Sequence, residues 1–495
     1  MKLKKLLSEI PVNQVKGSRD VDITGICSNS KLVAPGNLFI AKKGKLEDGA
    51  LYIPEAIAGG AVAVLTDIFN PSIKNITQIV HPNVSMIEAL LAEHYYQFAS
   101  QELFMVGITG TNGKTTTSFL IKHLLDQLKG PCGLIGTIEY IIGQQRYQAT
   151  RTTPDVVSNH KMLREMVLHG CRSAVMEVTS HALDQGRVQH IDFDVAVFTN
   201  LTVDHLDYHK TMENYCSAKN KLFSTLINEK KQSKKAFPKI AVVNADSPWH
   251  KQIIQGCKAS IITYGIDNAA DLKATDIHMS GQGTQLNLNY QGHIVACKSP
   301  LVGRYNVYNT LAAIAVGLTQ NIALENLAKM ISTFSAVSGR LEPVQNPLGL
   351  KIYVDFAHSD DALTNVLECL SEIKQKRIIT VFGCGGDRDK SKRPLMAKAC
   401  EEFSDVSIVT SDNPRSEDPL AILQQVTQGF RRKESYTVIP DRYAAIEHAI
   451  NIATPEDIVL IAGKGHEAYQ IFSHKIIEFD DRKVALQICQ NKKSK

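Results

Sequence analysis

Short runs of apolar residues, bounded by polar or turn-forming residues, recur along the chain and alternate with stretches of helical periodicity. In the first half, the runs that predict buried strands are 23–26, 38–41, 61–65, 77–80, 103–108, 174–177, 195–198 and 240–243. Helices are predicted over 85–98 and over 117–128, where leucine and isoleucine recur on one face. Apolar strands that alternate with helices predict a parallel sheet with helices on both faces.

A second series of the same kind begins after residue 338. Its predicted strands are 352–355, 378–382, 406–410, 436–439 and 458–462. Between the two series, residues 270–300 alternate more strictly between apolar and polar side chains, which predicts antiparallel pairing, and a helix follows over 309–318. The lysine-rich end of the chain, 492–495, is predicted to be disordered.

These patterns predict an α/β protein of three domains. A small N-terminal α/β domain is expected over 1–85, a central parallel-sheet domain over 86–335, and a Rossmann-like C-terminal domain over 336–495. In open parallel sheets, ligands bind beyond the carboxyl ends of the strands. The polar residues that directly follow the predicted strands are therefore the first candidates for a functional site.

The composition narrows the class of protein. A chain of 495 residues is too long for one hydrophobic core, and 44% hydrophobic with 21% charged residues is ordinary for a soluble globular protein. The net charge of +5 is spread along the chain, so no nucleic-acid footprint is indicated. The ten cysteines form no C-x-x-C pair, which favours reduced thiols in a cytoplasmic enzyme over a disulfide scaffold or a zinc site. No apolar run reaches about 18 residues, so no membrane span is expected.

The most informative stretch lies between the predicted strand 103–108 and the predicted helix 117–128. It reads Thr109-Gly110-Thr111-Asn112-Gly113-Lys114-Thr115-Thr116. A glycine-rich turn before a helix N-terminus presents backbone N–H groups and partial positive charge, which suits a polyphosphate. We therefore expect this P-loop to bind a nucleotide, with Lys114 at the β- and γ-phosphates and the Thr115 hydroxyl on Mg²⁺. The strict pattern has glycine where this chain has Ile108, and the alternative is a glycine turn whose lysine is solvated.

Residues that suit a metal ion follow two other predicted strands. The segment 199–209 carries His205 and His209 with two aspartates directly after a strand, and Glu177 ends another strand. Mg²⁺ takes oxygen ligands with a few others and shares the phosphates of its substrate. These residues predict a magnesium site beside the P-loop, and a polar surface loop is the alternative.

Several motifs occur here in the order in which they occur in the Mur ligases, and the resemblance spans essentially the whole chain. It implies a three-domain, ATP-dependent amide synthase of peptidoglycan precursor synthesis, and we expect it to be a monomer. In that family, ATP phosphorylates a substrate carboxylate, and the amine of an amino acid attacks the acyl phosphate. The motifs are 109–116, 199–209, Tyr215-Cys216-Ser217-Ala218-Lys219, Gly303-Arg304-Tyr305-Asn306-Val307-Tyr308-Asn309, Gly339-Arg340-Leu341-Glu342 and Asp355-Phe356-Ala357-His358.

The resemblance also implies the catalytic residues. Glu177 and His205 match the family's Mg²⁺ ligands, with Thr115 completing the metal shell, and Lys114 would stabilise the charge on the transferred phosphate. Lys219 matches a position at which CO₂ converts the amine to a carbamate. A carbamate anion can hold Mg²⁺, whereas an ammonium would repel it. Without the resemblance, Lys219 would be interpreted as a surface charge on a helix.

Further matches implicate other residues in nucleotide binding. Asn306 resembles the adenine contact, and Arg340, Asp355 and His358 resemble the contribution of the third domain. A helix cap or a surface ion pair is the alternative for each. The family's Tyr-Ala-His-Thr-Pro is replaced by 356–360, which reads Phe-Ala-His-Ser-Asp. The chain therefore departs from the pattern directly after His358.

The UDP-muramoyl peptide of the family is expected on the first domain and on central loops. Ser28 and Ser30 are the expected uridine contacts, although Asn29 and Lys31 depart from the family's Asp-Ser-Arg. The residues that match peptide-binding positions are Thr152, Thr153, Thr179, Gln185 and Arg187, with Thr179 in place of serine. The planar fork of Arg187 suits a carboxylate or a diphosphate.

Residues 412–415, which read Asp412-Asn413-Pro414-Arg415, resemble the branch of the family that adds meso-diaminopimelate. The distal carboxylate of that amino acid needs a bidentate cation, which Arg415 supplies. Arg388, Gly463 and Glu467 match its other contacts, with Glu467 on the distal ammonium. A turn whose arginine is only a surface charge is the alternative.

Three rival functions remain. An L-lysine-adding ligase would share most of the motifs, and a folylpolyglutamate synthase would share the P-loop and the carbamylated lysine. The synthase would not need a uridine-binding domain or residues 412–415. A nucleotide-dependent regulatory switch would instead carry an Asn-Lys-x-Asp motif, which this chain lacks. The substrates expected here are ATP, UDP-MurNAc-L-Ala-D-Glu and meso-diaminopimelate.

Overall fold

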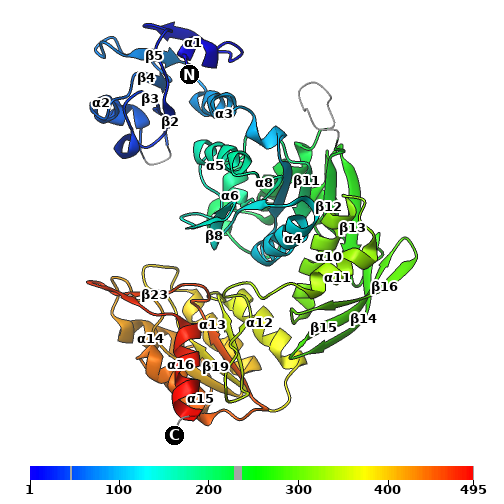
Figure 1. Cartoon of the computed structure of the whole chain (residues 1–495). Coiled ribbons are helices and arrows are strands. Elements are labelled where there is room, and N and C mark those ends of the chain that lie inside the picture. The colour runs from blue at the N-terminus through cyan, green and yellow to red at the C-terminus, as the bar shows by residue number, and fades with distance from the viewer. Residues whose placement is uncertain (45–46, 228–236, 494–495) are drawn as a thin grey trace. The chain divides into compact units, whose positions relative to one another are not determined.

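The computed structural model describes residues 1–44, 47–227 and 237–493 of the chain. It divides into two compact units, one formed by 1–272 with 312–322 and the other by 273–311 with 323–495 (Figure 1). The first unit contains two separate parallel-rich sheets and the second contains a third. The predicted α/β class with three domains is confirmed. The domain bounds at 85 and 335 stay a prediction.

The first unit begins with a five-stranded sheet in the order β1-β5-β4-β3-β2. β1 is antiparallel to β5, and the other neighbours are parallel. Leu38, Leu65 and Ile79 of the sheet share one buried cluster with Ile87 and Leu91 of α3, so this helix covers the sheet. The elements are α1 (Leu3–Leu6), β1 (Gln14–Lys16), β2 (Gly25–Cys27), β3 (Asn37–Ile40), α2 (Ile53–Ala58), β4 (Ala63–Thr66), β5 (Thr77–Val80) and α3 (Val84–Tyr95).

Within the first unit, the central sheet runs in the order β13-β12-β11-β6-β10-β7-β8-β9, with β6 (Phe104–Thr109) in its interior. The strands from β13 to β7 run parallel, and β8 and β9 are antiparallel. The remaining strands are β7 (Cys132–Ile135), β8 (Glu139–Ile142), β9 (Gln145–Gln148), β10 (Ser173–Glu177), β11 (Val195–Phe198), β12 (Ile240–Asn244) and β13 (Ser260–Gly265). The helices are α4 (Lys114–Lys129), α5 (Val156–Leu168), α6 (Ser180–Asp184), α7 (Leu206–His209), α8 (Met212–Ser224) and α9 (His250–Ile253).

The chain enters the second unit through β14 (Leu272–Ser280) and β15 (Gly283–Tyr290), and β15 pairs antiparallel with β16 (His293–Ser299). The antiparallel pairing predicted for 270–300 is therefore confirmed. The helix predicted over 309–318 is longer than expected, because α10 spans Arg304–Leu318. α11 (Leu324–Ser332) follows, and the chain then begins the C-terminal sheet.

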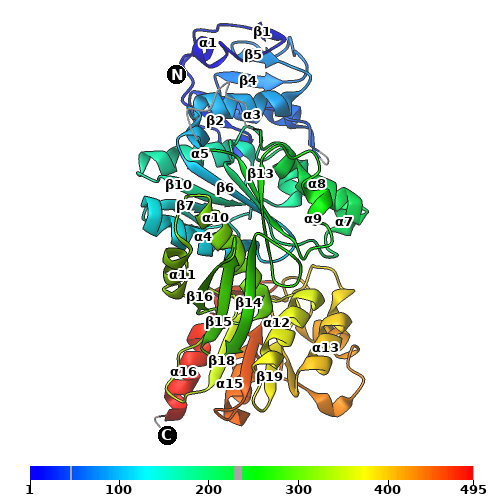
Figure 2. The same ribbon diagram turned by 90° about the vertical axis from the view of Figure 1, so that its right-hand side faces the viewer.

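The C-terminal sheet has the order β17-β18-β22-β19-β20-β21, parallel except for β17. Ile378 and Phe382 of β19 pack with α12 and α13, whereas Ile379 and Val381 pack with α15 and α16. This alternation places helices on both faces (Figure 2). The elements are β17 (Glu342–Pro343), β18 (Lys351–Asp355), α12 (Asp360–Glu372), β19 (Ile378–Phe382), α13 (Lys392–Phe403), β20 (Val406–Val409), α14 (Pro419–Thr427), β21 (Tyr436–Val438), α15 (Arg442–Ile452), β22 (Ile458–Ala462), β23 (Tyr469–Ile471), β24 (Ile476–Glu478) and α16 (Asp481–Lys493).

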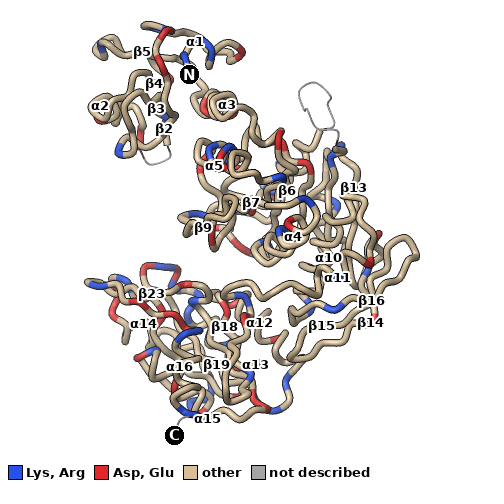
Figure 3. Tube along the Cα trace, in the orientation of Figure 1, with Lys and Arg blue, Asp and Glu red and all other residues tan. Residues whose placement is uncertain are grey.

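Positions of lysine and arginine are interspersed with those of aspartate and glutamate along the elements of each unit (Figure 3). None of the helices in the described part of the chain is long and apolar enough to cross a bilayer. The predicted disorder of the lysine-rich end is wrong for Lys492 and Lys493, which end α16. Lys492 Nζ donates to Ile450 O at 3.2 Å and so ties the helix to α15. Residues 494–495 lie outside the described residues.

Candidate functional site

The P-loop lies where it was predicted, between the end of β6 and the first turn of α4. A Cβ at Gly110 would lie 1.9 Å from Thr199 Oγ1, so only glycine fits this close approach. Gly113 has φ 84°, a left-handed conformation that glycine adopts readily, and α4 begins at Lys114. Ile108, which stands where the strict pattern has glycine, is a fully buried residue of β6. Gly110 and Gly113 therefore supply the turn.

Two residues after β11 hold the P-loop backbone in place. Thr111 N donates to Asn200 O, and Asn112 N donates to Asn200 Oδ1, both at 2.9 Å. Thr199 Oγ1 and Asn200 Nδ2 in turn donate to Asn112 O at 2.7 and 3.2 Å. Reciprocal bonds of this kind fix the loop to the neighbouring strand and pre-organise it for an anion.

Two lysine ammonium groups converge on the P-loop. Lys114 Nζ lies over its own loop and donates to Gly110 O at 3.0 Å and to Thr111 O at 2.7 Å. Lys219 Nζ, from α8, donates to the same Gly110 oxygen at 2.8 Å. It also lies 4.5 Å from the centroid of the Tyr215 ring. The two lysines are 105 positions apart in the sequence, and the fold places both on one carbonyl.

Lys219 is a buried lysine rather than a surface charge, because its exposed fraction is only 1%. Burial lowers the pKa of the Lys219 ammonium well below its usual range, and the charge of Lys114 lowers that pKa further. A lysine with a lowered pKa holds more neutral amine at neutral pH. The neutral amine is the form that reacts with electrophiles such as CO₂.

Glu177 is fully buried at the carboxyl end of β10, and its carboxylate faces the P-loop helix. Thr115 Oγ1 donates to Glu177 Oε2 at 3.0 Å. The two other donors both come from Thr137, whose N–H reaches Oε1 at 2.9 Å and whose hydroxyl reaches Oε2 at 2.8 Å. Thr115 and Glu177, two of the predicted metal ligands, are therefore in contact. Their hydroxyl and carboxylate oxygens are ligand atoms that suit a hard cation.

His205 lies at the start of α7 with φ 54°, a left-handed conformation that costs free energy in residues other than glycine. Its ring packs edge-on at 4.9 Å from the His181 ring and 6.1 Å from the Tyr215 ring. Burial lowers the pKa of His205, which favours the neutral imidazole that ligates metals. Tyr215 thus lies next to both Lys219 and His205.

Among the described residues, no three His, Cys, Asp or Glu side chains gather closely enough to hold a metal ion by themselves. Thr115 and Glu177 are in contact, whereas no direct contact joins Glu177 to His205 or Lys219 in the part of the chain that the structure describes. This arrangement fits Mg²⁺ in phosphate-transfer sites, where the ion uses one or two protein ligands and the phosphates of its substrate. It does not resemble an all-protein metal cage.

The residues predicted to hold the muramoyl peptide gather at the same edge of the sheet. Thr153 Oγ1 donates to Glu177 O at 2.8 Å and to Thr179 Oγ1 at 3.3 Å, and Thr179 caps α6. Arg187 Nη1 donates to Thr153 O at 3.0 Å, and Arg187 Nη2 donates to Gln185 Oε1 at 2.6 Å. The hydroxyl groups and the guanidinium thus form one polar surface beside Glu177.

Thr152 joins this surface through Thr137, because the two hydroxyl oxygens are 3.2 Å apart. The predicted uridine contacts lie in the connection that follows β2 of the first sheet. Ser28 is exposed, and the Ser30 hydroxyl donates to a carboxylate oxygen of Glu55. Asn29, one of the departures from the family pattern, accepts from Lys31 N at 3.1 Å and caps the short turn that carries Ser30.

Three of the nucleotide residues predicted in the second unit lie around β18: Arg340 precedes β17, Asp355 ends β18 and His358 follows it. Both oxygens of the buried Asp355 carboxylate accept backbone N–H groups at 2.7 Å, and burial raises its pKa. The Arg340 guanidinium lies over the Phe356 ring, 5.1 Å from its centroid. His358 Nδ1 is 2.9 Å from Phe356 O. The turn after His358 is well defined without the family's proline, because the Ser359 side chain caps α12.

Asn306 lies in the first turn of α10 and is 4% exposed. Its Nδ2 donates to Val302 O at 2.8 Å, and its Oδ1 accepts from Asn309 Nδ2 at 2.9 Å. These bonds hold the side chain in one orientation at the start of the helix. Its predicted role as the adenine contact stays a prediction.

The predicted amino-acid site is assembled from loops at the carboxyl ends of β19, β20 and β22. Asn413 Nδ2 donates to Glu467 Oε2 at 2.8 Å, so two of the predicted contacts touch directly. Arg415 has φ 55° and is held there by its N–H, which donates to Ile471 O at 3.0 Å. One arm of its guanidinium donates to Gly386 O at 2.7 Å. No described residue forms a hydrogen bond with the other nitrogen atoms of the Arg415 guanidinium.

Gly463, Asp412 and Pro414 complete this loop cluster. A Cβ at Gly463 would lie 2.5 Å from Asp412 Oδ2, and a Cβ at Gly386 would lie 1.9 Å from Pro414 O. Asp412 Oδ2 is buried, and no described residue donates a hydrogen bond to it. Arg388 stands apart from the cluster, because its side chain is exposed and its one hydrogen bond with a described residue is a long one to Asp387 O at 3.5 Å.

Comparison with known proteins decides the family. Three models match the chain: the Mur ligase family catalytic domain over residues 22–96, the Mur ligase middle domain over 108–317 and the Mur ligase glutamate ligase domain over 339–465. The chain is 44% identical over 493 residues to UDP-N-acetylmuramoyl-L-alanyl-D-glutamate--2,6-diaminopimelate ligase of Chlamydia felis, covering 99% of each protein. The chain belongs to the Mur ligase family.

Mur ligases are ATP-dependent enzymes that form amide bonds, and this chain is one of them. A relative of the same name from Listeria monocytogenes is 43% identical over 482 residues, or 97% of each protein. A solved structure of UDP-N-acetylmuramoyl-L-alanyl-D-glutamate--2,6-diaminopimelate ligase matches with a TM-score of 0.72 and 32% identity. That match covers 100% of this chain and 99% of the other.

Within this Mur ligase, Thr137 is a site residue that the sequence did not reveal. It follows the short strand β7 and Gly136, and no apolar run of useful length marks that strand. Thr137 is nonetheless a polar residue just past the end of a parallel strand, separated from it by Gly136, where ligands of parallel sheets bind. Asn200 was part of a recognised motif, but its role in fixing the P-loop needed the pairing of β6 with β11.

Thr137→Val tests whether this hydroxyl orients Glu177. Valine keeps the shape and the backbone N–H bond but removes the donor to Oε2 and the link to Thr152. We expect the Mg²⁺ concentration for half-maximal activity to rise about fivefold, the usual worth of one such bond. Thr137→Ser, which keeps the hydroxyl, should behave as the wild type. Mn²⁺ binding measured by electron paramagnetic resonance with ADP present provides a readout besides activity, and unchanged affinity in Thr137→Val would contradict this role.

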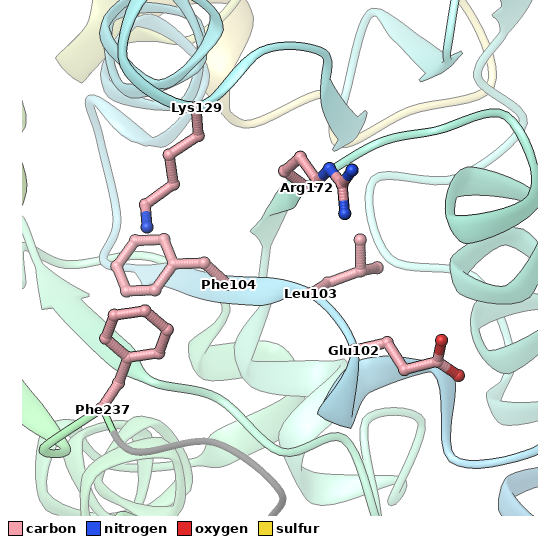
Figure 4. Close-up of a pocket in the computed structure, with 6 residues that line it drawn as sticks. All are labelled: Glu102, Leu103, Phe104, Lys129, Arg172 and Phe237. Carbon is pink, nitrogen blue, oxygen red and sulfur yellow. The ribbon is translucent and has the colours of Figure 1, made fainter.

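One pocket of the first unit is not part of this site. It has a volume of about 340 Å³ and lies beside Phe104, the first residue of β6, at the end of the strand opposite to the P-loop. Figure 4 shows the Lys129 ammonium beside the Phe104 and Phe237 rings. Its distances to the two ring centroids are 5.2 and 4.7 Å, so the cation already occupies the aromatic faces.

Proposed function

We propose that this chain joins meso-diaminopimelate to the D-Glu side-chain carboxylate of UDP-MurNAc-L-Ala-D-Glu, with conversion of ATP to ADP and phosphate, in peptidoglycan precursor synthesis. The observation that carries the proposal is the sequence identity of 43–44%, over nearly the full length of the chain, with relatives named for this ligase. The arrangement of residues 412–415 with Glu467 supports the choice of amino acid.

The carboxylate is activated first because a carboxylate is a poor electrophile. One of its oxygens attacks the γ-phosphorus of ATP, the bond to the β,γ-bridging oxygen breaks, and ADP leaves. Lys114 stabilises the charge on the transferred phosphate from its place over the P-loop, and the N-terminus of α4 adds partial positive charge. The product of this step is an acyl phosphate.

The amine of meso-diaminopimelate then attacks the acyl carbon and gives a tetrahedral intermediate. Collapse of this intermediate breaks the bond to the phosphate oxygen, releases phosphate and leaves the amide, while the amine loses its proton to solvent or phosphate. Thr153, Thr179 and Arg187 would hold the muramoyl peptide beside Glu177 for both steps.

Thr115, Glu177 and His205 would hold Mg²⁺, and their donor atoms fit that ion: a hydroxyl, a buried carboxylate and a neutral imidazole. When bound, Mg²⁺ neutralises phosphate charge. The neutral amine of Lys219 would add to CO₂ with loss of one proton, giving an anionic carbamate in place of an ammonium beside Lys114. The burial of Lys219 and the lowered pKa of its ammonium support this modification.

The nucleotide base would contact Asn306, and Arg340, Asp355 and His358 would bind the rest of the nucleotide. Arg415 and Arg388 would take the carboxylates of meso-diaminopimelate, and Glu467 its distal ammonium, with Asp412, Asn413, Pro414 and Gly463 shaping the site. We further propose that the enzyme works as a cytoplasmic monomer. Its ten cysteines are all free thiols, which suits a reducing compartment.

Phosphate release tests the proposed function directly. The purified protein receives ATP, Mg²⁺ and UDP-MurNAc-L-Ala-D-Glu, and meso-diaminopimelate, L-lysine or L-glutamate is added in turn. We expect release to depend on meso-diaminopimelate, with kcat/KM at least about 100-fold above that for L-lysine. Preference for L-lysine would make the chain a lysine-adding ligase. In a parallel assay with a folate in place of the UDP-peptide, phosphate release with L-glutamate would favour a folylpolyglutamate synthase. Release that ignores all amino acids would favour a switch.

A further inference from the structure

Lys464 is a buried cation in the predicted amino-acid site that no part of the proposed mechanism uses. It follows Gly463 after β22, and its side chain is 0% exposed. The glycines on either side have φ of 115° and 54°, so the backbone turns sharply at this residue. Charged side chains are rarely buried unless they are paired, so the position of this ammonium needs an explanation.

The Lys464 ammonium is bonded to two residues predicted to bind the amino acid. It donates to Asn413 Oδ1 at 3.1 Å and to Glu467 Oε2 at 3.3 Å. Asn413 Nδ2 donates to the same Glu467 oxygen at 2.8 Å. These three side chains therefore form a closed triangle of hydrogen bonds in which the lysine supplies the positive charge.

The triangle fixes the orientation of both partners. Asn413 Oδ1 accepts from Lys464 and from Ile471 N, the latter at 3.1 Å, so its amide oxygen must face these two donors. The amide nitrogen then faces Glu467. Both bonds to Glu467 end on Oε2, and no described residue donates a hydrogen bond to Oε1. The carboxylate is thus held by one oxygen while the other stays available to a ligand.

The Tyr469 ring lies on another side of the ammonium, 5.7 Å from Nζ to the ring centroid. β23, which begins at Tyr469, also supplies Ile471, whose carbonyl holds Arg415. Lys464 therefore lies where the loop after β20 and the loop after β22 meet. A buried cation at this junction stabilises the pair of loops only in the arrangement in which Asn413 and Glu467 face each other.

We propose that Lys464 is a positioning residue of the amino-acid site: it holds Glu467 by Oε2, through a direct bond and through Asn413, so that Oε1 accepts the distal ammonium of the incoming amino acid. This inference rests on the proposed function for the role of Glu467. A lysine that acts in this way affects binding of the amino acid and leaves binding of ATP and of the UDP-peptide unchanged.

The test is a double-mutant cycle with Lys464→Met and Glu467→Gln in the full-length enzyme. Methionine keeps the length of the side chain and removes its charge. We expect Lys464→Met to raise KM for meso-diaminopimelate about 10- to 100-fold, the usual effect of removing a group that orients a ligand-binding side chain. KM for ATP should stay within about twofold of the wild-type value. In the Glu467→Gln background, the same substitution should change KM for the amino acid by no more than about twofold.

Arg377→Met is the matched control. Arg377 is also ion-paired in the second unit, with Asp457 at 2.8 Å, but it precedes β19 and so lies at the opposite end of the sheet. Its removal should lower the melting temperature without raising KM for the amino acid. Additive effects of Lys464→Met and Glu467→Gln, or an equal rise in KM for ATP, would overturn the inference.

If Lys464→Met does not fold, Lys464→Gln is used in its place. If neither variant folds, the inference is overturned, because Lys464 would then serve folding rather than the position of Glu467. The wild type is first assayed with meso-diaminopimelate and with L-lysine. If only L-lysine is used, the proposed substrate is wrong, and the cycle is run with L-lysine, which has a distal ammonium as well. The two failures are therefore distinguishable.

Discussion

Lys219→Ala is expected to lower kcat for ligation by about a thousandfold, the scale on which one preorganised electrostatic group acts in a transition state. The variant loses the anion that the carbamate would place beside Lys114 and the P-loop. The fold should survive, because Gly110 O is the only hydrogen-bond partner of the Lys219 side chain among the described residues. Phosphate release with all substrates at saturation measures the effect.

Rescue separates a carbamate from a lysine that acts as a cation. Lys219 is 1% exposed, so alanine leaves a space the size of the lost side chain, and formate or acetate can enter it and restore the missing anion. Lys219→Met fills that space and should resist rescue by either acid. A ¹³C carbamate signal from the wild type in ¹³CO₂-equilibrated buffer, absent from Lys219→Ala, provides a readout besides activity. Rescue by methylamine instead of formate would show that a cation is required.

Lys221 offers a control on the same helix. It lies two residues further along α8, is half-exposed and pairs with Asp184 at 2.9 Å. Lys221→Ala should keep activity within about twofold of the wild type, because exposed ion pairs contribute little. Full activity in Lys219→Ala would remove the carbamate from the mechanism.

The contrast between Lys219 and Lys221 shows where sequence reasoning stops. Both are lysines on one predicted helix, and neither spacing nor composition separates a buried one from an exposed one. Only the resemblance to the Mur ligases singled out Lys219. Its burial and its bond to Gly110 O depend on how α8 packs on the central sheet, which is a property of tertiary structure.

The strands that could be predicted from the sequence are those with long apolar runs and buried side chains. β11 and β19 are fully buried and match the predicted bounds 195–198 and 378–382. β9 was missed because its four residues are exposed and polar, so the hydrophobic pattern contains no sign of it. β7 was missed because glycine interrupts a run of only four residues. Edge strands and short strands are specified by their neighbours more than by their own sequence.

The site shows the same division. The P-loop and the residues at strand ends could be located from the sequence, because a parallel sheet gathers its carboxyl ends at one edge. The roles of Thr137 and Lys464 could not be predicted in this way, because each acts on another side chain rather than on a ligand. The contacts Thr137 to Glu177 and Lys464 to Glu467 depend on register and rotamers, which hydrophobic patterning does not encode.

Arg415→Asn is expected to lower kcat/KM for meso-diaminopimelate about 100-fold and to leave kcat/KM for L-lysine nearly unchanged. The reason lies in the guanidinium. One arm is held by Gly386 O at 2.7 Å, so the fork is fixed in place before a ligand binds. A carboxylate bound by two charge-assisted hydrogen bonds gains about 3 kcal/mol, roughly a hundredfold in kcat/KM. L-Lysine has no distal carboxylate and so cannot gain from these bonds.

The backbone at residue 415 decides whether this substitution is a fair test. Arg415 has φ 55°, and asparagine is one of the residues that adopt this left-handed conformation most readily. The N–H bond to Ile471 O at 3.0 Å does not depend on the side chain, so the turn should persist in Arg415→Asn. Arg415→Lys is the matched variant, because it keeps the charge and removes the fork.

Discrimination between the two amino acids should therefore fall in a defined order. The ratio of kcat/KM for meso-diaminopimelate to kcat/KM for L-lysine should be highest in the wild type, intermediate in Arg415→Lys and lowest in Arg415→Asn. Arg415→Lys is intermediate because the lysine ammonium attracts the distal carboxylate as a point charge but does not bind both of its oxygens. Equal losses for both amino acids in Arg415→Asn would mean that Arg415 supports the loop rather than the carboxylate. A wild type that prefers L-lysine would place the selectivity elsewhere, since the fork would then have no carboxylate to bind.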